Sequence, residues 1–218
     1  MQKRIGLIVA TTLTVATAAV ASAATVDKTS FSGSQATTGF FFASTPLDCN
    51  GDGQSDGDAV LIGDIFGSQS VAKSIGSRPQ FNDGLDVEVF FYSNPCTNVF
   101  ASGSAGIAGG FKAPNPQLNG ATMSGTGTLQ DFSGPSFPLS VDLRLKGVGP
   151  AFTSSGSQET KTVGGRGGNI YISVDRSANS NRNALATGTI VVDGVTFAIN
   201  SDSGLLVGNS SSTLTIQR

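Results

Sequence analysis

The stretch Leu139-Ser140-Val141-Asp142-Leu143-Arg144-Leu145-Lys146 decides the fold, because apolar and polar residues alternate along its whole length. Successive side chains of a β-strand point to opposite faces of a sheet, so one face of this stretch meets a core and the other meets water. A helix would need apolar residues three and four positions apart. The stretch therefore predicts an amphipathic strand of an antiparallel sheet.

Alternating or β-branched segments recur along the rest of the chain. In 85–92 the alternation places Leu85, Val87, Val89 and Phe91 on one face. Asp193-Gly194 supplies the positive φ angles of a two-residue hairpin turn. Further strands are expected at 39–43, 99–101, 121–129, 168–175, 189–197 and 212–216. The sequence predicts an all-β fold, an antiparallel sandwich or barrel of about nine to eleven strands.

Three segments are expected to differ from this pattern. Residues 59–66 are predicted to form one short helix that turns Val60, Leu61, Ile65 and Phe66 inward. Residues 147–168 and 176–183 are rich in Gly, Ser, Asn and Thr and are predicted to be loops. The run 39–43 is expected to be a strand covered on both faces. No repeat of fixed period and no linker divides the chain, so residues 24–218 are predicted to be a single β-rich domain.

The first 23 residues predict export. Lys3 and Arg4 precede 16 uncharged residues, and Ala21-Ser22-Ala23 is an A-x-A cleavage signature. Cleavage is expected between Ala23 and Ala24. The apolar core is shorter than the roughly 20 residues of a membrane span. A cleaved signal peptide, a secreted or periplasmic location and no transmembrane segment in the mature chain are therefore expected.

The charge of the mature chain excludes some partners. Loss of Lys3 and Arg4 leaves 11 basic and 15 acidic residues, a net charge of −4. Nothing is basic enough to indicate a nucleic-acid partner. Other partners stay unknown from the sequence.

The only two cysteines, Cys49 and Cys96, are expected to form a disulfide bond, because a lone pair in an oxidising compartment is usually bridged. Free thiols remain the alternative.

The segment 48–58 is the most distinctive motif, with the spacing D-x-N-x-D-G-x-x-D. Calcium takes six to eight oxygen ligands, and acidic and amide side chains at alternate positions of a tight loop supply them. The motif resembles the calcium loops of EF-hand-like, dockerin and thrombospondin type 3 modules. The predicted metal residues are Asp48, Asn50, Asp52, Gln54, Asp56 and Asp58.

The motif also departs from an EF-hand, because Ala59 stands where the bidentate glutamate belongs. Asp64 is considered as a distal substitute. The alternative is a solvated turn, since Asp, Asn and Gly favour turns without any metal. Against that alternative, five acidic residues and no basic residue lie between Thr29 and Ala72. Carboxylates that crowd together repel one another unless a cation intervenes.

Catalytic motifs are scarce. The chain contains no histidine, so a Ser-His-Asp arrangement cannot form. Asp86 and Glu88 share a strand face about 7 Å apart by strand rise, which leaves a carboxylate-dependent hydrolase as a minor alternative. Another alternative is a small-molecule binder with an apolar barrel interior, suggested by Phe40, Phe41, Phe42, Phe90 and Phe91.

The order of features from Val87 onward resembles a group of bacterial secreted proteins to which no activity is assigned. The residues that carry it are Val89-Phe90-Phe91-Tyr92 with Cys96-Thr97, the 139–145 strand, Gly149-Pro150, the Asp193-Gly194 hairpin and Leu214-Thr215-Ile216. The resemblance implies an exported β-fold. From the 48–58 motif and the scarcity of catalytic motifs, we expect an exported, non-enzymatic protein, calcium-stabilised through the 48–58 loop and extracellular or surface-associated.

Overall fold

A computed structural model describes residues 25–164 and 169–217, and every regular element in them is a β-strand. The strands are β1 (Thr25–Thr37), β2 (Phe41–Leu47), β3 (Gly57–Ser74), β4 (Gln80–Asn94), β5 (Val99–Ile107), β6 (Phe111–Lys112), β7 (Gly120–Asp131), β8 (Ser136–Gly147), β9 (Phe152–Gly164), β10 (Asn169–Val192) and β11 (Val195–Gln217). They form one 11-stranded antiparallel sheet. The prediction of an all-β fold with nine to eleven antiparallel strands is confirmed.

The sheet closes into a barrel-like ring because β1 pairs on both of its sides. All of β1 pairs with β11, and residues 29–37 also pair with β3. The pairing then runs from β11 through β10, β8, β7, β5 and β4 back to β3, so eight strands form the ring. β2 lies beyond the end of β1 and pairs with residues 57–63 of β3.

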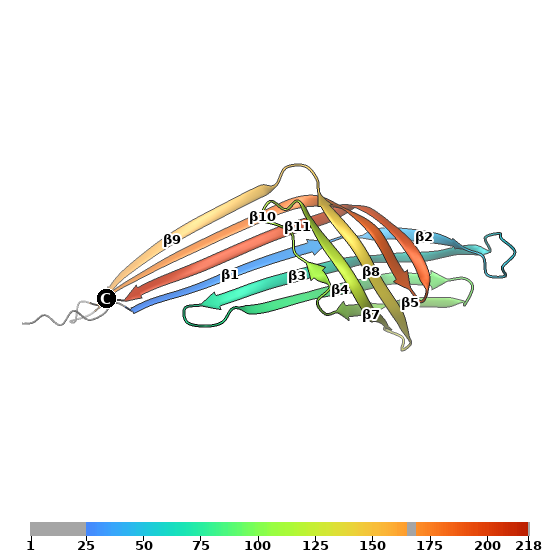
Figure 1. Cartoon of the computed structure of the whole chain (residues 1–218), viewed down its shortest axis with the longest axis horizontal. Coiled ribbons are helices and arrows are strands. Elements are labelled where there is room, and N and C mark those ends of the chain that lie inside the picture. Colours follow the sequence, from blue (N-terminus) through green and yellow to red (C-terminus); the bar gives the residue numbers. More distant parts are fainter. Residues whose placement is uncertain (1–24, 165–168, 218) are drawn as a thin grey trace, which may run out of the picture.

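Long strands continue past the ring and form an extension (Figure 1). We call this extension the arm. It consists of β9 together with residues 169–182 of β10, 207–217 of β11, 25–35 of β1 and 68–74 of β3. β9 forms one edge of the arm, because it pairs only with β10 among the described strands.

The core fills the interior of the ring with alternate strand residues. In β8 the buried residues are Phe137, Leu139, Val141, Leu143 and Leu145, as the alternation predicts. The Tyr92 ring packs edge-on against Phe137 and Phe197, with centroid separations of 6.1 Å in both pairs. Its hydroxyl donates to the Val192 carbonyl at 3.4 Å, so the one polar atom of this cluster has a partner.

The β6–β7 connection seals the core where the ring meets the arm. Leu118 is 1% exposed, and a Cβ built on Gly208 would lie 3.6 Å from its side chain. The Arg182 guanidinium holds this connection by donating to Asn119 Oδ1 at 2.8 Å and to the Gln117 carbonyl at 3.4 Å. The inner face of the arm is therefore separated from the hydrophobic interior.

Two details of the predicted strands are wrong, the first because of a β-bulge in β4. The register between β4 and β5 shifts between Val89 and Tyr92. A bulge adds one residue to a strand and reverses the alternation beyond it. Tyr92 therefore points inward and Phe91 outward, with 0% and 38% exposure. The 39–43 run is not covered on both faces either, since Phe42 is 64% exposed.

The short helix predicted at residues 59–66 is instead part of β3. Ala59, Leu61 and Ile65 are fully buried, and Phe66 is 37% exposed. The inward residues of β3 follow a strand period without interruption, because the register shift between Ile62 and Gly63 comes from the extra residue in β4.

The two predicted loops are also largely strands. Most of 147–168 is β9, and 176–183 lies inside β10. Small polar residues form strands here because both faces of the arm meet solvent, so no apolar alternation is needed. The predicted signal peptide, with its cleavage site at Ala23 and Ala24, lies outside the described residues. No helix within the described ranges is long and apolar enough to cross a membrane.

Gly188 provides a test of the ring, because β10 and β8 approach closely there. Its φ is +140°, and a Cβ would lie 2.1 Å from the Asp142 carbonyl oxygen. Gly188→Ala should lower the free energy of unfolding by about 2 kcal/mol or more, from backbone strain and overlap. Gly84 has nothing within 4 Å of its Cβ position. The control Gly84→Ala should change stability by less than about 0.5 kcal/mol in the same denaturant titration. Equal effects of the two substitutions would contradict the register of β8 and β10.

Candidate functional site

The predicted calcium loop connects β2 to β3 at the end of the molecule opposite the arm (Figure 1). The Asp56 amide donates to the Leu47 carbonyl at 2.8 Å and closes the neck of the loop. Asp48, Asn50, Asp52, Gln54 and Asp56 all lie in this exposed loop. Asp58 does not, because it belongs to β3 and pairs with Pro46.

Asp48 organises the first half of the loop. Its Oδ1 accepts the Gly51 amide at 2.6 Å and the Asp52 amide at 3.2 Å, and its Oδ2 accepts the Gly53 amide at 2.7 Å. Gly51 and Gly53 have φ angles of 80° and 84°, which the turn requires and which residues with a Cβ rarely adopt.

The backbone hydrogen bonds also set the charge state of Asp48. The Gly53 amide has the largest effect and lowers the pKa of the Asp48 carboxyl below its ordinary 3.8. Partial desolvation opposes that shift, and the Gly51 and Asp52 amides add to it. The carboxylate is therefore ionised at neutral pH, which is the state that a cation needs.

Three further loop side chains follow the same scheme. Asn50 Oδ1 accepts the Asp52 amide at 2.9 Å, and Asp52 Oδ1 accepts the Gln54 amide at 2.8 Å. Asp56 Oδ2 accepts the Cys49 amide at 2.8 Å. The Asn50 amide nitrogen lies 3.3 Å from Asp52 Oδ2 and 3.4 Å from Asp56 Oδ1. The loop thus brings Asn50, Asp52 and Asp56 together, with Asp48 bound to the same backbone turn.

The disulfide predicted between Cys49 and Cys96 is present, with a Cα–Cα distance of 5.1 Å. It fixes the loop to the turn between β4 and β5, where Asn94 Oδ1 accepts the Cys96 amide at 3.0 Å. The sequence separation is 47 residues, for which the chain-entropy model gives about 4 kcal/mol of stabilisation. The disulfide fits an oxidising, exported environment.

Acidic residues elsewhere do not complete the loop. Asp64 lies in β3, where its Oδ1 accepts the hydroxyls of Thr37 at 2.6 Å and Thr38 at 3.1 Å. It faces Glu88 across the β3–β4 pair, and with Asp86 they border a hollow of about 300 Å³. Within the described ranges, no three acidic, cysteine or histidine side chains converge closely enough to form a ready metal site.

Four of the five phenylalanines considered for an apolar interior lie on the outside. Phe41 is 3% exposed, whereas Phe40, Phe42, Phe90 and Phe91 are 38–64% exposed. The Phe40 and Phe90 rings stack with centroids 5.9 Å apart. The bulge in β4 is the reason that Phe90 and Phe91 both face outward. These rings do not line a cavity inside the ring.

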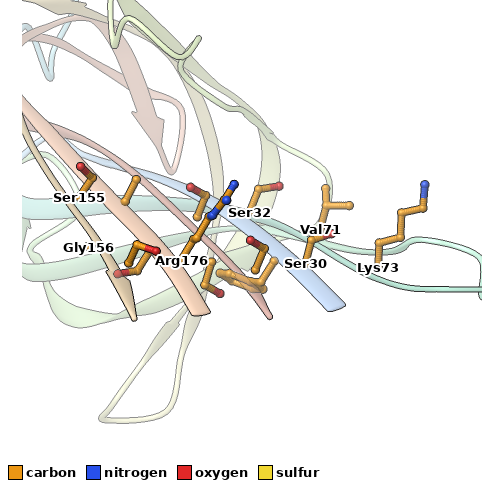
Figure 2. Close-up of a pocket in the computed structure, with 14 residues that line it drawn as sticks. Ser30, Ser32, Val71, Lys73, Ser155, Gly156 and Arg176 are labelled. Carbon is orange, nitrogen blue, oxygen red and sulfur yellow. The ribbon is translucent and has the colours of Figure 1, made fainter. Parts of the chain in front are cut away.

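The arm contains a hollow of about 730 Å³ that the sequence interpretation missed (Figure 2). Its lining comes from five strands, and much of it lies in the segments that were predicted to be loops. The recurring serines of 154–157 and 210–212 were the available signal, but only the strand register shows that they adjoin. Neither a family model, nor a curated protein, nor a solved structure matches the chain.

The pKa of Asp48 can be measured directly. Its carboxyl carbon should titrate in NMR spectra with a midpoint below 3.8, and the Gly51 and Gly53 amide signals should shift at the same pH. Because the folded pKa is lowered, this stabilisation is complete above the unfolded value and is lost as the pH falls through the folded value. Asp48→Asn should abolish the shared transition. A midpoint at or above 3.8 would contradict the three backbone hydrogen bonds.

Proposed function

We propose that the chain is an exported, non-enzymatic protein that binds calcium in the 48–56 loop and works outside the cell or at a surface. One observation carries the proposal: the backbone of the loop already holds the oxygens of Asp48, Asn50, Asp52 and Asp56 around one turn. These oxygens do not yet converge on one point, so a hard cation that prefers oxygen ligands would draw them closer around this turn.

The cation would enter beside Asn50. Asp52 Oδ2 and Asp56 Oδ1 are not held by backbone amides, and both face the Asn50 amide nitrogen. A calcium ion would replace this weak amide contact and draw the two carboxylates together. It would also remove the mutual repulsion of three exposed carboxylates within nine residues. The gain is an ordered loop at the end of the ring, where the disulfide already restrains one side.

Several features support a non-enzymatic role. The chain has no histidine for acid–base catalysis. Asp86 and Glu88 stand on an exposed strand face rather than in a deep cleft. The interior of the ring is filled by side chains such as Tyr92, Phe197 and Leu61, each 0% exposed, so it does not favour a small-molecule site there.

The test is a thermal melt of the exported, oxidised protein in millimolar calcium, in magnesium and in excess chelator. Calcium at 100 times its dissociation constant should add about 2.7 kcal/mol, which raises the Tm by several degrees for a domain of this size. Magnesium should give a much smaller rise, because it demands stricter octahedral geometry.

Asp52→Asn/Asp56→Asn should abolish the calcium-dependent rise while retaining the acceptors for the backbone amides. The matched control is Asp83→Asn/Asp202→Asn, which removes the same charge from exposed positions outside the loop. The control should keep the full rise. The proposal is wrong if the wild-type protein has the same Tm in calcium and in chelator. It is also wrong if calcium raises the Tm of both double variants equally.

A further inference from the structure

The hollow of the arm lies on the face that continues the interior of the ring. Ala36 and Leu206 are buried in the core and pair with each other, and alternate residues outward from them stay on the same face. On β1 and β11 these are Ser34 with Gly208, Ser32 with Ser210, and Ser30 with Ser212. Leu118 closes the core next to Gly208, so the face beyond it is open to solvent.

Strand register arranges the lining in two parallel rows. One row crosses the arm through Ser157, Arg176, Ser212, Ser30 and Lys73, and the next through Ser155, Ala178, Ser210, Ser32 and Val71. Serine and alanine are short, so the floor is low between the longer side chains of Arg176, Val71 and Lys73. Figure 2 shows these three side chains rising from the same side of the sheet. The difference in side-chain length creates the hollow.

Polar groups in the hollow are available to a ligand. Other hydroxyls of this region are engaged, since Ser180 donates to the Gly208 carbonyl and Thr213 to Asp175 Oδ1. Within the described chain, no hydrogen bond involves the Arg176 or Lys73 side chain or the six hydroxyls of the two rows. Those hydroxyls belong to Ser30, Ser32, Ser155, Ser157, Ser210 and Ser212.

The charge of the hollow is opposite to that of the whole chain. Arg176 and Lys73 line it and no acidic residue does, although the exported chain has a net charge of −4. Lys28 follows on the same face, two residues before Ser30. On this face Glu159 is the nearest acidic residue by register, opposite Val174 and two residues beyond the Arg176 row, whereas Asp175 points to the other face. The hollow is a local cationic patch on an anionic protein.

The distance between the cations selects the class of ligand. Arg176 on β10 and Lys73 on β3 stand three strand spacings apart in one row, about 14 Å. At this backbone separation each cation can hold its own anionic group. A chain molecule that carries repeated anionic groups reaches both, and its hydroxyls can exchange hydrogen bonds with the serines between them. We propose that this hollow binds an acidic polysaccharide, with carboxylate or sulfate groups at Arg176 and Lys73 and sugar hydroxyls over the serine rows.

The experiment is calorimetric titration of the whole exported protein with polygalacturonate, a polymer of uronic acid, at low ionic strength. Dextran serves as the neutral polysaccharide and polyphosphate as the polyanion without sugar. We expect polygalacturonate to bind, dextran to bind at least about tenfold more weakly, and polyphosphate to bind more weakly than polygalacturonate. Equal binding of polygalacturonate and polyphosphate would overturn the polysaccharide assignment.

Two variants locate the site. Arg176→Ala/Lys73→Ala should weaken polygalacturonate binding at least about tenfold, a factor that corresponds to about 1.4 kcal/mol. Arg144→Ala/Lys146→Ala removes the same charge from exposed positions of β8 and should have little effect. Ser30→Ala/Ser212→Ala, which keeps both cations, should weaken binding several-fold. Unchanged melting of each variant ensures that folding is intact.

Absence of polygalacturonate binding by the wild type, or equal weakening by the two charge variants, would overturn the proposal. The proposal does not depend on calcium. The hollow and the 48–56 loop lie at opposite ends of the molecule (Figure 1). A failure here would therefore leave the melting test of the loop unaffected, and the reverse also holds.

Discussion

The structure depends on the pairing of β1 with two strands at once, β11 on one side and β3 on the other. Without it the sheet would be open, with β11 and part of β3 as unpaired edges. The corner after β1 holds this closure in place. The Thr38 backbone amide donates to the Ile65 carbonyl at 3.0 Å, and Ser201 Oγ donates to the Thr38 carbonyl at 2.9 Å. Gly39 is required next, because a Cβ there would lie 2.4 Å from the Ser203 carbonyl oxygen.

Closure also separates the two candidate sites. Side chains fill the core inside the ring, and Leu118 closes it at the arm, so neither site includes residues of the core. The acidic loop lies beyond one end of the ring and the cationic hollow beyond the other (Figure 1). Opposite charges thus stand at opposite ends of one scaffold, an arrangement that suits simultaneous binding of a cation and an anionic polymer.

The sequence predicts the fold class well and the arm poorly, for one physical reason. Wherever one face of a strand is buried, as in β8, apolar and polar residues alternate in the sequence. The Asp193-Gly194 turn is also recognisable, because its φ angles of 50° and 79° need those residue types. In the arm both faces are wet, so 152–164 and 176–183 lack alternation although they are strands. The bulge that turns Phe91 outward depends on the pairing with β5, which no local pattern encodes. The loop residues were predicted because ligand spacing is local, whereas the hollow joins strands distant in sequence.

Amide hydrogen exchange of the native protein tests the closure of the ring most directly. Residues 30–37 of β1 lie between two strands, whereas β9 has β10 on one side only among the described residues. In a closed ring, the amides of residues 30–37 that point toward β11 and those that point toward β3 should all exchange as slowly as the amides of the central strand β10. Outward-facing amides of β9 should exchange much faster. If every second amide of residues 30–37 exchanged as fast as those of β9, β1 would be an edge strand and the ring would be open.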